Sequence, residues 1–170
     1  LQVQSHILPG NVTYGVTNTY TDGPTTHRFD FTPKSTNSTV IYRLSGWLGT
    51  GTSSGTNIQG QTGRNLGLML KDYTANQIID ANDYTSGGHT NNVPNAPQVN
   101  WISPDGGGGQ NSVEFIFTSS ATTTMKLGLQ VITGGTNTES YVVWGNDAKA
   151  QSEHNRNVPF LTVTITEIQN

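Results

Sequence analysis

The sequence has 170 residues, of which only 11% are Asp, Glu, Lys or Arg, and its formal net charge is -3. This balance excludes the basic surface that follows nucleic-acid phosphates, and the sequence has neither the basic clusters that attract a protein to anionic lipids nor an apolar run long enough for membrane insertion. The length suits a single domain, 1–170, with a full core. The absence of cysteine favours folding in a reducing cytoplasm. Because the chain begins with Leu1 rather than Met, we expect a fragment or a processed product of a longer polypeptide.

The chain is rich in β-branched residues and poor in strong helix formers, which favours an all-β fold. Apolar and polar residues alternate through several short stretches, as they do in strands with one buried face. One of these stretches stops before Pro33, which has no amide hydrogen for a sheet. The pattern predicts strands over residues 1–7, 12–20, 29–31 and 40–44.

Two polar segments interrupt the strands in the middle of the chain. Residues 46–63 are rich in Gly, Thr and Ser, and residues 80–97 are rich in Asn, Gly and Pro, so we expect two long surface loops. Between them, residues 66–70 alternate again and residues 77–80 are their predicted hairpin partner. A further short strand is expected at 99–101.

The clearest alternation lies in residues 112–133, which we interpret as one antiparallel hairpin with a polar connection at 119–124. One face of this hairpin is apolar and belongs to the core. Ile116 and Ile132 are out of step on the polar face, which suggests that a neighbouring subunit covers part of it.

The chain closes with predicted strands at 141–144 and 160–168. About ten short strands separated by turn signals are typical of a sandwich. The expected fold class is therefore all-β, an antiparallel β-sandwich of the jelly-roll kind with two long polar loops.

No constellation in the sequence predicts catalysis, a cofactor or a metal, so we expect a protein that is not an enzyme. The histidines lack zinc-site spacing, and no nucleophile elbow of the G-x-S-x-G type occurs. Residues 80–83 are rich in oxygen atoms, but Tyr84 stands where a calcium loop needs its third ligand. A turn with Asx hydrogen bonds is favoured there, and calcium stays an alternative.

Exposed aromatic and polar residues are the candidates for contact with a receptor or a subunit. Trp47 falls opposite the apolar face of its strand, which favours an exposed position, whereas Trp144 lies in a uniformly apolar stretch that leaves its side undecided. In the loop 80–97 we single out Asp83, Tyr84 and His89.

Three stretches together resemble a family of tailed-phage virion domains: the opening Leu-Gln-Val, the run Phe-Asp-Phe-Thr-Pro-Lys-Ser-Thr-Asn-Ser at 29–38, and the closing Leu-Thr-Val-Thr-Ile-Thr-Glu-Ile at 161–168. Members of this family are β-sandwich modules, often at the C-terminal end of tail fibres. The chain departs from the family at 39–42, where Thr-Val-Ile-Tyr replaces a basic residue and an aliphatic run.

The resemblance implies a structural or adhesive role on the virion surface, after assembly in the host cytoplasm. It implies that the chain forms a homotrimer and contacts other virion proteins. It also implies that the loops contact a host glycan or protein. It brings no catalytic residues. The alternatives are a capsid-decoration or head-fibre protein and a non-catalytic carbohydrate-binding module.

Overall fold

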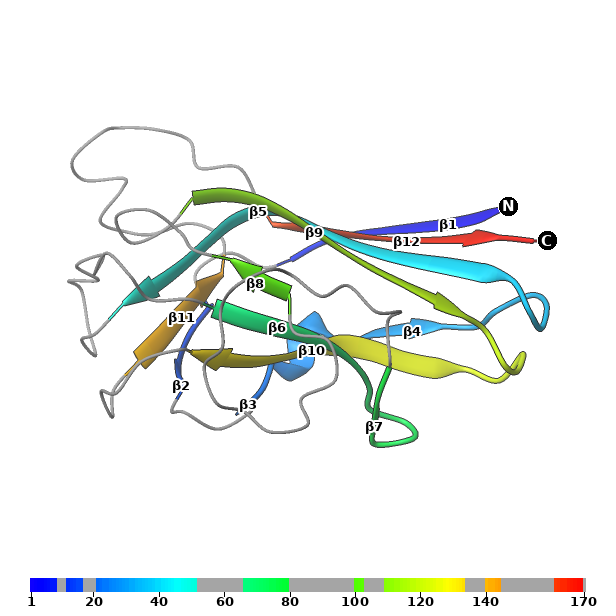
Figure 1. Ribbon diagram of the computed structural model, residues 1–170, viewed down its shortest axis with the longest axis horizontal. Helices are drawn as coiled ribbons and strands as arrows, with labels where there is room; N and C mark the ends of the chain where they lie inside the picture. The colour runs from blue at the N-terminus through cyan, green and yellow to red at the C-terminus, as the bar shows by residue number, and fades with distance from the viewer. Residues whose placement is uncertain are drawn as a thin grey trace.

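In the computed structural model, the backbone is described for residues 1–8, 12–16, 21–51, 66–79, 100–102, 109–133, 140–144 and 161–169. Within these segments, side chains are described for residues 1–8, 21–46, 68–79, 112–131 and 161–169. This part of the chain forms two six-stranded antiparallel sheets packed face to face, with a single 3-10 turn, η1 (Thr25–His27) (Figure 1). The predicted all-β antiparallel sandwich is confirmed.

The first sheet contains β1 (Gln2–Ile7), β2 (Val12–Val16), β5 (Thr39–Gly51), β9 (Gly109–Thr118), β11 (Ser140–Trp144) and β12 (Thr162–Ile168). The long strand β5 is its centre. One edge of β5 pairs with β12 and then with β11, and the other edge pairs with β9. β1 and β2 lie beyond β12 and β11, respectively.

The second sheet contains β3 (Thr21–Asp22), β4 (Phe29–Phe31), β6 (Leu66–Asp72), β7 (Gln77–Ile78), β8 (Asn100–Ile102) and β10 (Met125–Thr133). β10 pairs with β3 and β4 on one edge and with β6 on the other. β7 and β8 follow each other along the far edge of β6. The predicted hairpin of 66–70 with 77–80 is thereby confirmed for residues 77–79, and Asp80 lies outside the described residues.

The connectivity is that of a jelly roll. Some strand positions in the sheets are each filled by two strands that follow one another along the same neighbouring strand or strand position. These pairs are β1 with β2, β3 with β4, β7 with β8, and β11 with β12. Eight positions remain, and in chain order they stand as 1-8-3-6 in one sheet and 2-7-4-5 in the other. Chain-neighbouring positions mostly lie in opposite sheets, which is how a jelly roll closes its core.

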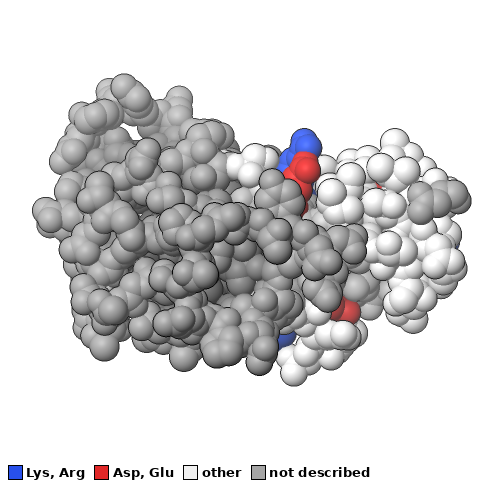
Figure 2. Space-filling view, in the orientation of Figure 1, with Lys and Arg blue, Asp and Glu red and all other residues white. Residues whose placement is uncertain are grey.

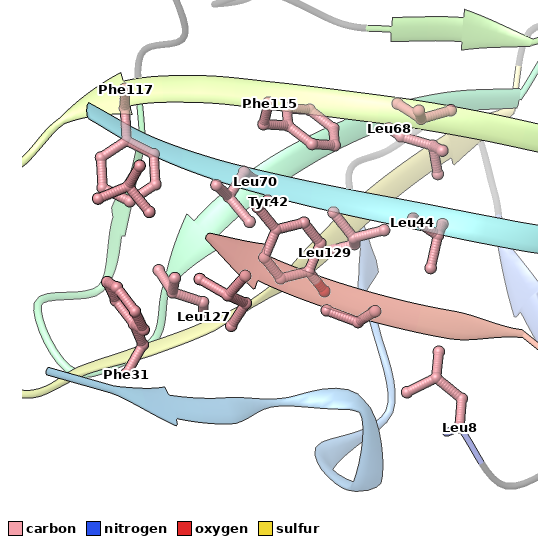
Figure 3. Close-up of a cluster of buried hydrophobic side chains, with 14 of the residues drawn as sticks. Leu8, Phe31, Tyr42, Leu44, Leu68, Leu70, Phe115, Phe117, Leu127 and Leu129 are labelled. Atoms are coloured by element: carbon pink, nitrogen blue, oxygen red, sulfur yellow. The ribbon is translucent and has the colours of Figure 1, made fainter. Parts of the chain in front are cut away.

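The core lies between the sheets and is made of alternate residues from both (Figure 3). Tyr42 and Phe115 meet edge to face near its middle, with ring centroids 6.3 Å apart. The other core residues are Leu8, Phe31, Val40, Leu44, Leu68, Leu70, Val113, Phe117, Leu127, Leu129, Val131, Leu161, Val163 and Ile165.

The prediction that residues 112–133 form one hairpin is wrong. β9 pairs with β5 in the first sheet, whereas β10 pairs with β6 in the second, so residues 119–124 cross between the sheets. Both strands do place their apolar face on the core. Alternation specifies which face is buried but not which strand lies alongside, and two strands facing one core from opposite sheets carry the same pattern.

The prediction of a loop over 46–63 is wrong for its first part, because β5 continues to Gly51. Residues 46–51 are held by β9 on one edge and by β11 on the other, so backbone pairing continues the strand through a stretch that contains three glycines. Gly46 has a φ of 141° and lies where β5 leaves β12 and joins β11. Residues without Cβ restrictions suit such a change of direction.

Candidate functional site

A cleft of about 500 Å³ opens at one edge of the sandwich, between β7 and the end of β9. Its polar lining consists of small uncharged groups and one carboxylate, and its apolar lining comes from the adjoining core. The lining residues are Asp72, Ala75, Gln77, Ile78, Ile79, Phe117, Thr118, Ser119, Ser120, Ala121, Thr123 and Met125. Charged side chains are few on the described part of the face shown in Figure 2.

The carboxylate of the cleft is held by the fold. One oxygen of Asp72 accepts hydrogen bonds from the amides of Thr74, at 2.9 Å, and Lys126, at 3.0 Å. These bonds fix the turn after β6 against β10 and leave the side chain buried. Asp72 therefore has a structural task, and the neighbouring hydroxyl and amide groups are better suited to meet a neutral polar ligand.

A long insertion begins at the lip of this cleft. The amide of Ile79 donates to the carbonyl of Leu70, and Asn100 pairs with Leu68 on the same edge of β6. One residue opposite Met69 would therefore join β7 to β8 as a continuous strand. The chain instead has 20 residues, 80–99, at this point. They leave and return at neighbouring places on one strand.

A second polar cluster surrounds Glu167, which is fully buried at the end of β12. Its Oε1 accepts from the amides of Lys34, at 2.9 Å, and Ser35, at 3.2 Å, and from the hydroxyl of Ser38, at 2.6 Å. The Ser38 hydroxyl also meets the Ser119 hydroxyl at 2.8 Å. The carboxylate thus ties together the two connections that cross between the sheets at this end.

The ionisation of Glu167 reflects these donors. Burial alone raises the pKa of its carboxyl, but the hydrogen bonds from Ser38, Lys34 and Ser35 outweigh burial and hold the pKa below its ordinary value. The side chain is therefore a charged structural group. Sequence reasoning missed it, although the parity it shares with Val163 and Ile165 predicts an inward-facing acid that must find donors.

A third cluster lies where β3 and β6 flank β10. Lys71 contacts Asp22 at 3.1 Å, and Gln130 donates to the same carboxylate at 2.7 Å. Burial raises the pKa of Asp22, but the hydrogen bonds from Gln130 and Lys71 lower it by a larger amount. The pKa of Asp22 therefore lies below its ordinary value. The guanidinium of Arg28 stacks 3.7 Å from the centre of the Tyr73 ring. These contacts join strands, and none of these groups faces the cleft.

The structure separates the predicted contact residues. Ile116 is exposed on the outer side of the first sheet, with 43% of its surface accessible, whereas Ile132 belongs to β10 in the second sheet. The single hairpin face that was predicted to carry both residues does not exist, and contact of either residue with a subunit stays a prediction.

The remaining candidates are placed only in part. Trp47 lies in β5 opposite Gln110, and Trp144 lies in β11 opposite Leu48, so the two tryptophans occupy neighbouring strands. Their side chains lie outside the described residues. Asp83, Tyr84 and His89 also lie outside the described residues, with the rest of the predicted loop 80–97.

In the described segments, no group of three or more His, Cys, Asp or Glu residues is placed to hold a metal ion. Nor does this part of the chain contain a helix that is both long and apolar enough to cross a membrane. No protein-family model matches the sequence, and no curated protein matches it either.

Proposed function

We propose that this chain is a structural and adhesive module of a phage virion surface, of the tail-fibre kind, and that residues 80–98 contact the host. The observation that carries the proposal is the register of β7 and β8. A single residue would complete this strand, and the chain has 20 residues at this point, 19 more than the pairing needs. Long segments on a rigid sheet scaffold commonly carry recognition.

The arrangement of the strand ends agrees with display of such a module. The N- and C-termini lie together at one end of the sandwich (Figure 1). The segments 52–65, 103–108 and 134–139 leave from and return to strand ends at the opposite end. A module attached through its termini therefore points these strand ends away from its attachment.

The test is a deletion that follows the register. Removing residues 80–98 leaves Val99 opposite Met69 and joins β7 to β8. We expect the purified variant to keep the thermal midpoint of the parent within a few degrees and to lose binding of the labelled protein to host cells. A variant in which the same 19 residues are replaced by a Gly/Ser linker is the matched control, because it keeps the length and removes the chemistry.

Host-cell binding that survives both changes would disprove the adhesive role of this insertion. Antibody labelling of intact particles provides the second test. A signal on the tail supports the proposal, whereas a signal on the head supports capsid decoration. The jelly-roll topology favours that second candidate, since capsid domains share it, although fold alone is an analogy.

A carbohydrate ligand is the form of receptor that the cleft favours, because its lining combines hydroxyl and amide groups with apolar surface. Binding of the parent protein to a glycan array, lost on Gln77→Ala but kept on Lys126→Ala, would support it. Lys126 is exposed and paired with Asp30 outside the cleft, so its replacement controls for general surface effects. Binding that is equal in all three proteins would place the glycan elsewhere.

A further inference from the structure

The edge strand β1 has an unusual surface for a strand at the border of a sheet. Val3 and Ile7 point outward with 57% and 70% of their surfaces accessible, and Leu1 just before them is 79% accessible. The strand contains no proline and no Lys, Arg, Asp or Glu, which are the residues that ordinarily guard an edge against pairing.

β1 is also held firmly enough to act as a template. It pairs along its length with β12, from Gln2 to Ile7. On its inner side the His6 ring stacks on Phe29 of the second sheet, with ring centroids 4.0 Å apart. No described strand pairs with its other edge.

The hydrogen bonds of β1 show which of its residues point their backbone amides and carbonyls toward the unpaired edge. The amide of Leu8 donates to the carbonyl of Leu161, at 2.8 Å, on the β12 side. Backbone groups point to alternate sides along an antiparallel strand, so even-numbered residues bond to β12. The amides and carbonyls of Val3, Ser5 and Ile7 therefore point away from the sheet.

These groups are complementary to a second copy of themselves. If two β1 strands meet antiparallel with Ser5 opposite Ser5, Val3 of each copy faces Ile7 of the other. All three positions carry outward-pointing backbone groups, so the pairs are of the hydrogen-bonded kind. They also share the outer face, where apolar residues then stand opposite apolar residues and hydroxyl opposite hydroxyl.

We propose that β1 pairs with β1 of a second copy of this chain, antiparallel and centred on Ser5, joining two first sheets into one continuous sheet. This gives a two-fold dimer in place of the trimer that the family resemblance implies. The pairing is independent of the proposed adhesive function, since it uses neither the insertion nor the cleft.

Cysteine cross-linking tests the register directly, because the chain has no cysteine of its own. Ser5→Cys places two thiols across the two-fold axis, with Cα atoms about 5.5 Å apart, within the range of a disulfide. Mild oxidation should convert this variant to a covalent dimer. Ile7→Cys is the matched control, since the two new thiols would lie about 13 Å apart along the strands and should not join.

Charge exchange tests the pairing without a covalent bond. Val3→Lys with Ile7→Lys sets like charges opposite each other, and sedimentation should show dimerisation weakened about tenfold or more. Val3→Lys with Ile7→Glu sets opposite charges across the interface and should restore the dimer. Ile116→Lys lies three strands from the edge on the same face and should leave the dimer unchanged.

Several results would overturn the proposal. A parent protein that stays monomeric in a concentration series reaching several hundred micromolar, or that forms a trimer, contradicts it. So does equal cross-linking at positions 5 and 7, or a failure of the Lys/Glu pair to restore association in a protein whose circular dichroism matches the parent. Loss of association on Ile116→Lys would assign the contact to the sheet face.

Discussion

Glu167 offers the sharpest test of how this sandwich is held together. Replacing it with alanine leaves the amides of Lys34 and Ser35 without their acceptor, whereas the hydroxyl of Ser38 loses its shortest hydrogen bond but keeps Ser35 and Ser119 as partners. Each such loss costs roughly 1–3 kcal/mol. Water entering the cavity recovers part of this, so we expect the free energy of unfolding to fall by about 3–5 kcal/mol. A domain stabilised by about 5–15 kcal/mol would lose much of its margin.

Glu167→Gln separates charge from shape. The amide keeps one oxygen for the donors but turns its NH2 group toward the amide of Lys34, which contacts both carboxylate oxygens in the parent. We expect a loss of about 2 kcal/mol, since hydrogen bonds to a charged acceptor are roughly twice as strong as neutral ones. Urea unfolding followed by circular dichroism gives both values. Thr166→Ala, on the outer side of the same strand, is the control.

The difference in unfolding free energy between the parent and Glu167→Gln should depend on pH, and this dependence tests whether Glu167 is charged in the folded protein. The folded-state pKa of Glu167 is depressed, so its contribution is present above the ordinary pKa of 4.5 and is lost as the pH falls through the folded-state pKa. The difference in unfolding free energy between the parent and Glu167→Gln should therefore shrink on acidification. A loss below about 0.5 kcal/mol at neutral pH, or a gap that does not change with pH, would refute the reasoning.

Three further predictions concern single positions. Gly128→Ala should destabilise the domain by about 1–2 kcal/mol in urea unfolding, because its Cβ would lie 3.0 Å from Arg28 and from the Tyr73 ring; no loss would mean that both side chains move aside freely. Absorbance titration should find the pKa of Tyr73 raised to about 12, chiefly by burial, so the stability it contributes is lost as the pH rises above 10, and a Tyr73→Phe spectrum identifies the signal. Gly46→Ala should cost about 1–3 kcal/mol at a φ of 141°, and a stability equal to the parent would show that β5 relaxes at this point.

The sequence was sufficient to predict strands and the local hairpin of β6 with β7, but not the partners of β9 and β10. The alternation of Val113, Phe115 and Phe117 marks a strand with one buried face, and the structure has that strand. Which strand pairs with it depends on contacts far apart in the chain, and the pairing with β5 leaves no local signature. The short connection at 119–124 suits a hairpin and a crossing between sheets equally well.

The candidate site was predictable only as a place where the chain is polar. Residues 80–97 were predicted to be a long polar loop from their composition, and they lie outside the described residues; that the segment interrupts one strand needs the register of β7 and β8. The Glu167 cluster joins residues more than a hundred positions apart, such as Ser38 and Glu167. The local sequence shows only that Glu167 shares the inner face of the last strand with Val163 and Ile165.

The placement of both chain ends has a mechanical consequence. β1 and β12 are antiparallel neighbours, and Gln2 lies opposite Glu167, so the two ends leave the same side of the sandwich. Tension applied between them would peel β1 from β12 one hydrogen-bonded pair at a time, whereas strands pulled from opposite ends share the load among all their pairs. Such a domain is weak as a link under tension in a chain and strong as a terminal or lateral unit attached at one point. A single-molecule pulling experiment through the two ends should therefore show a low opening force.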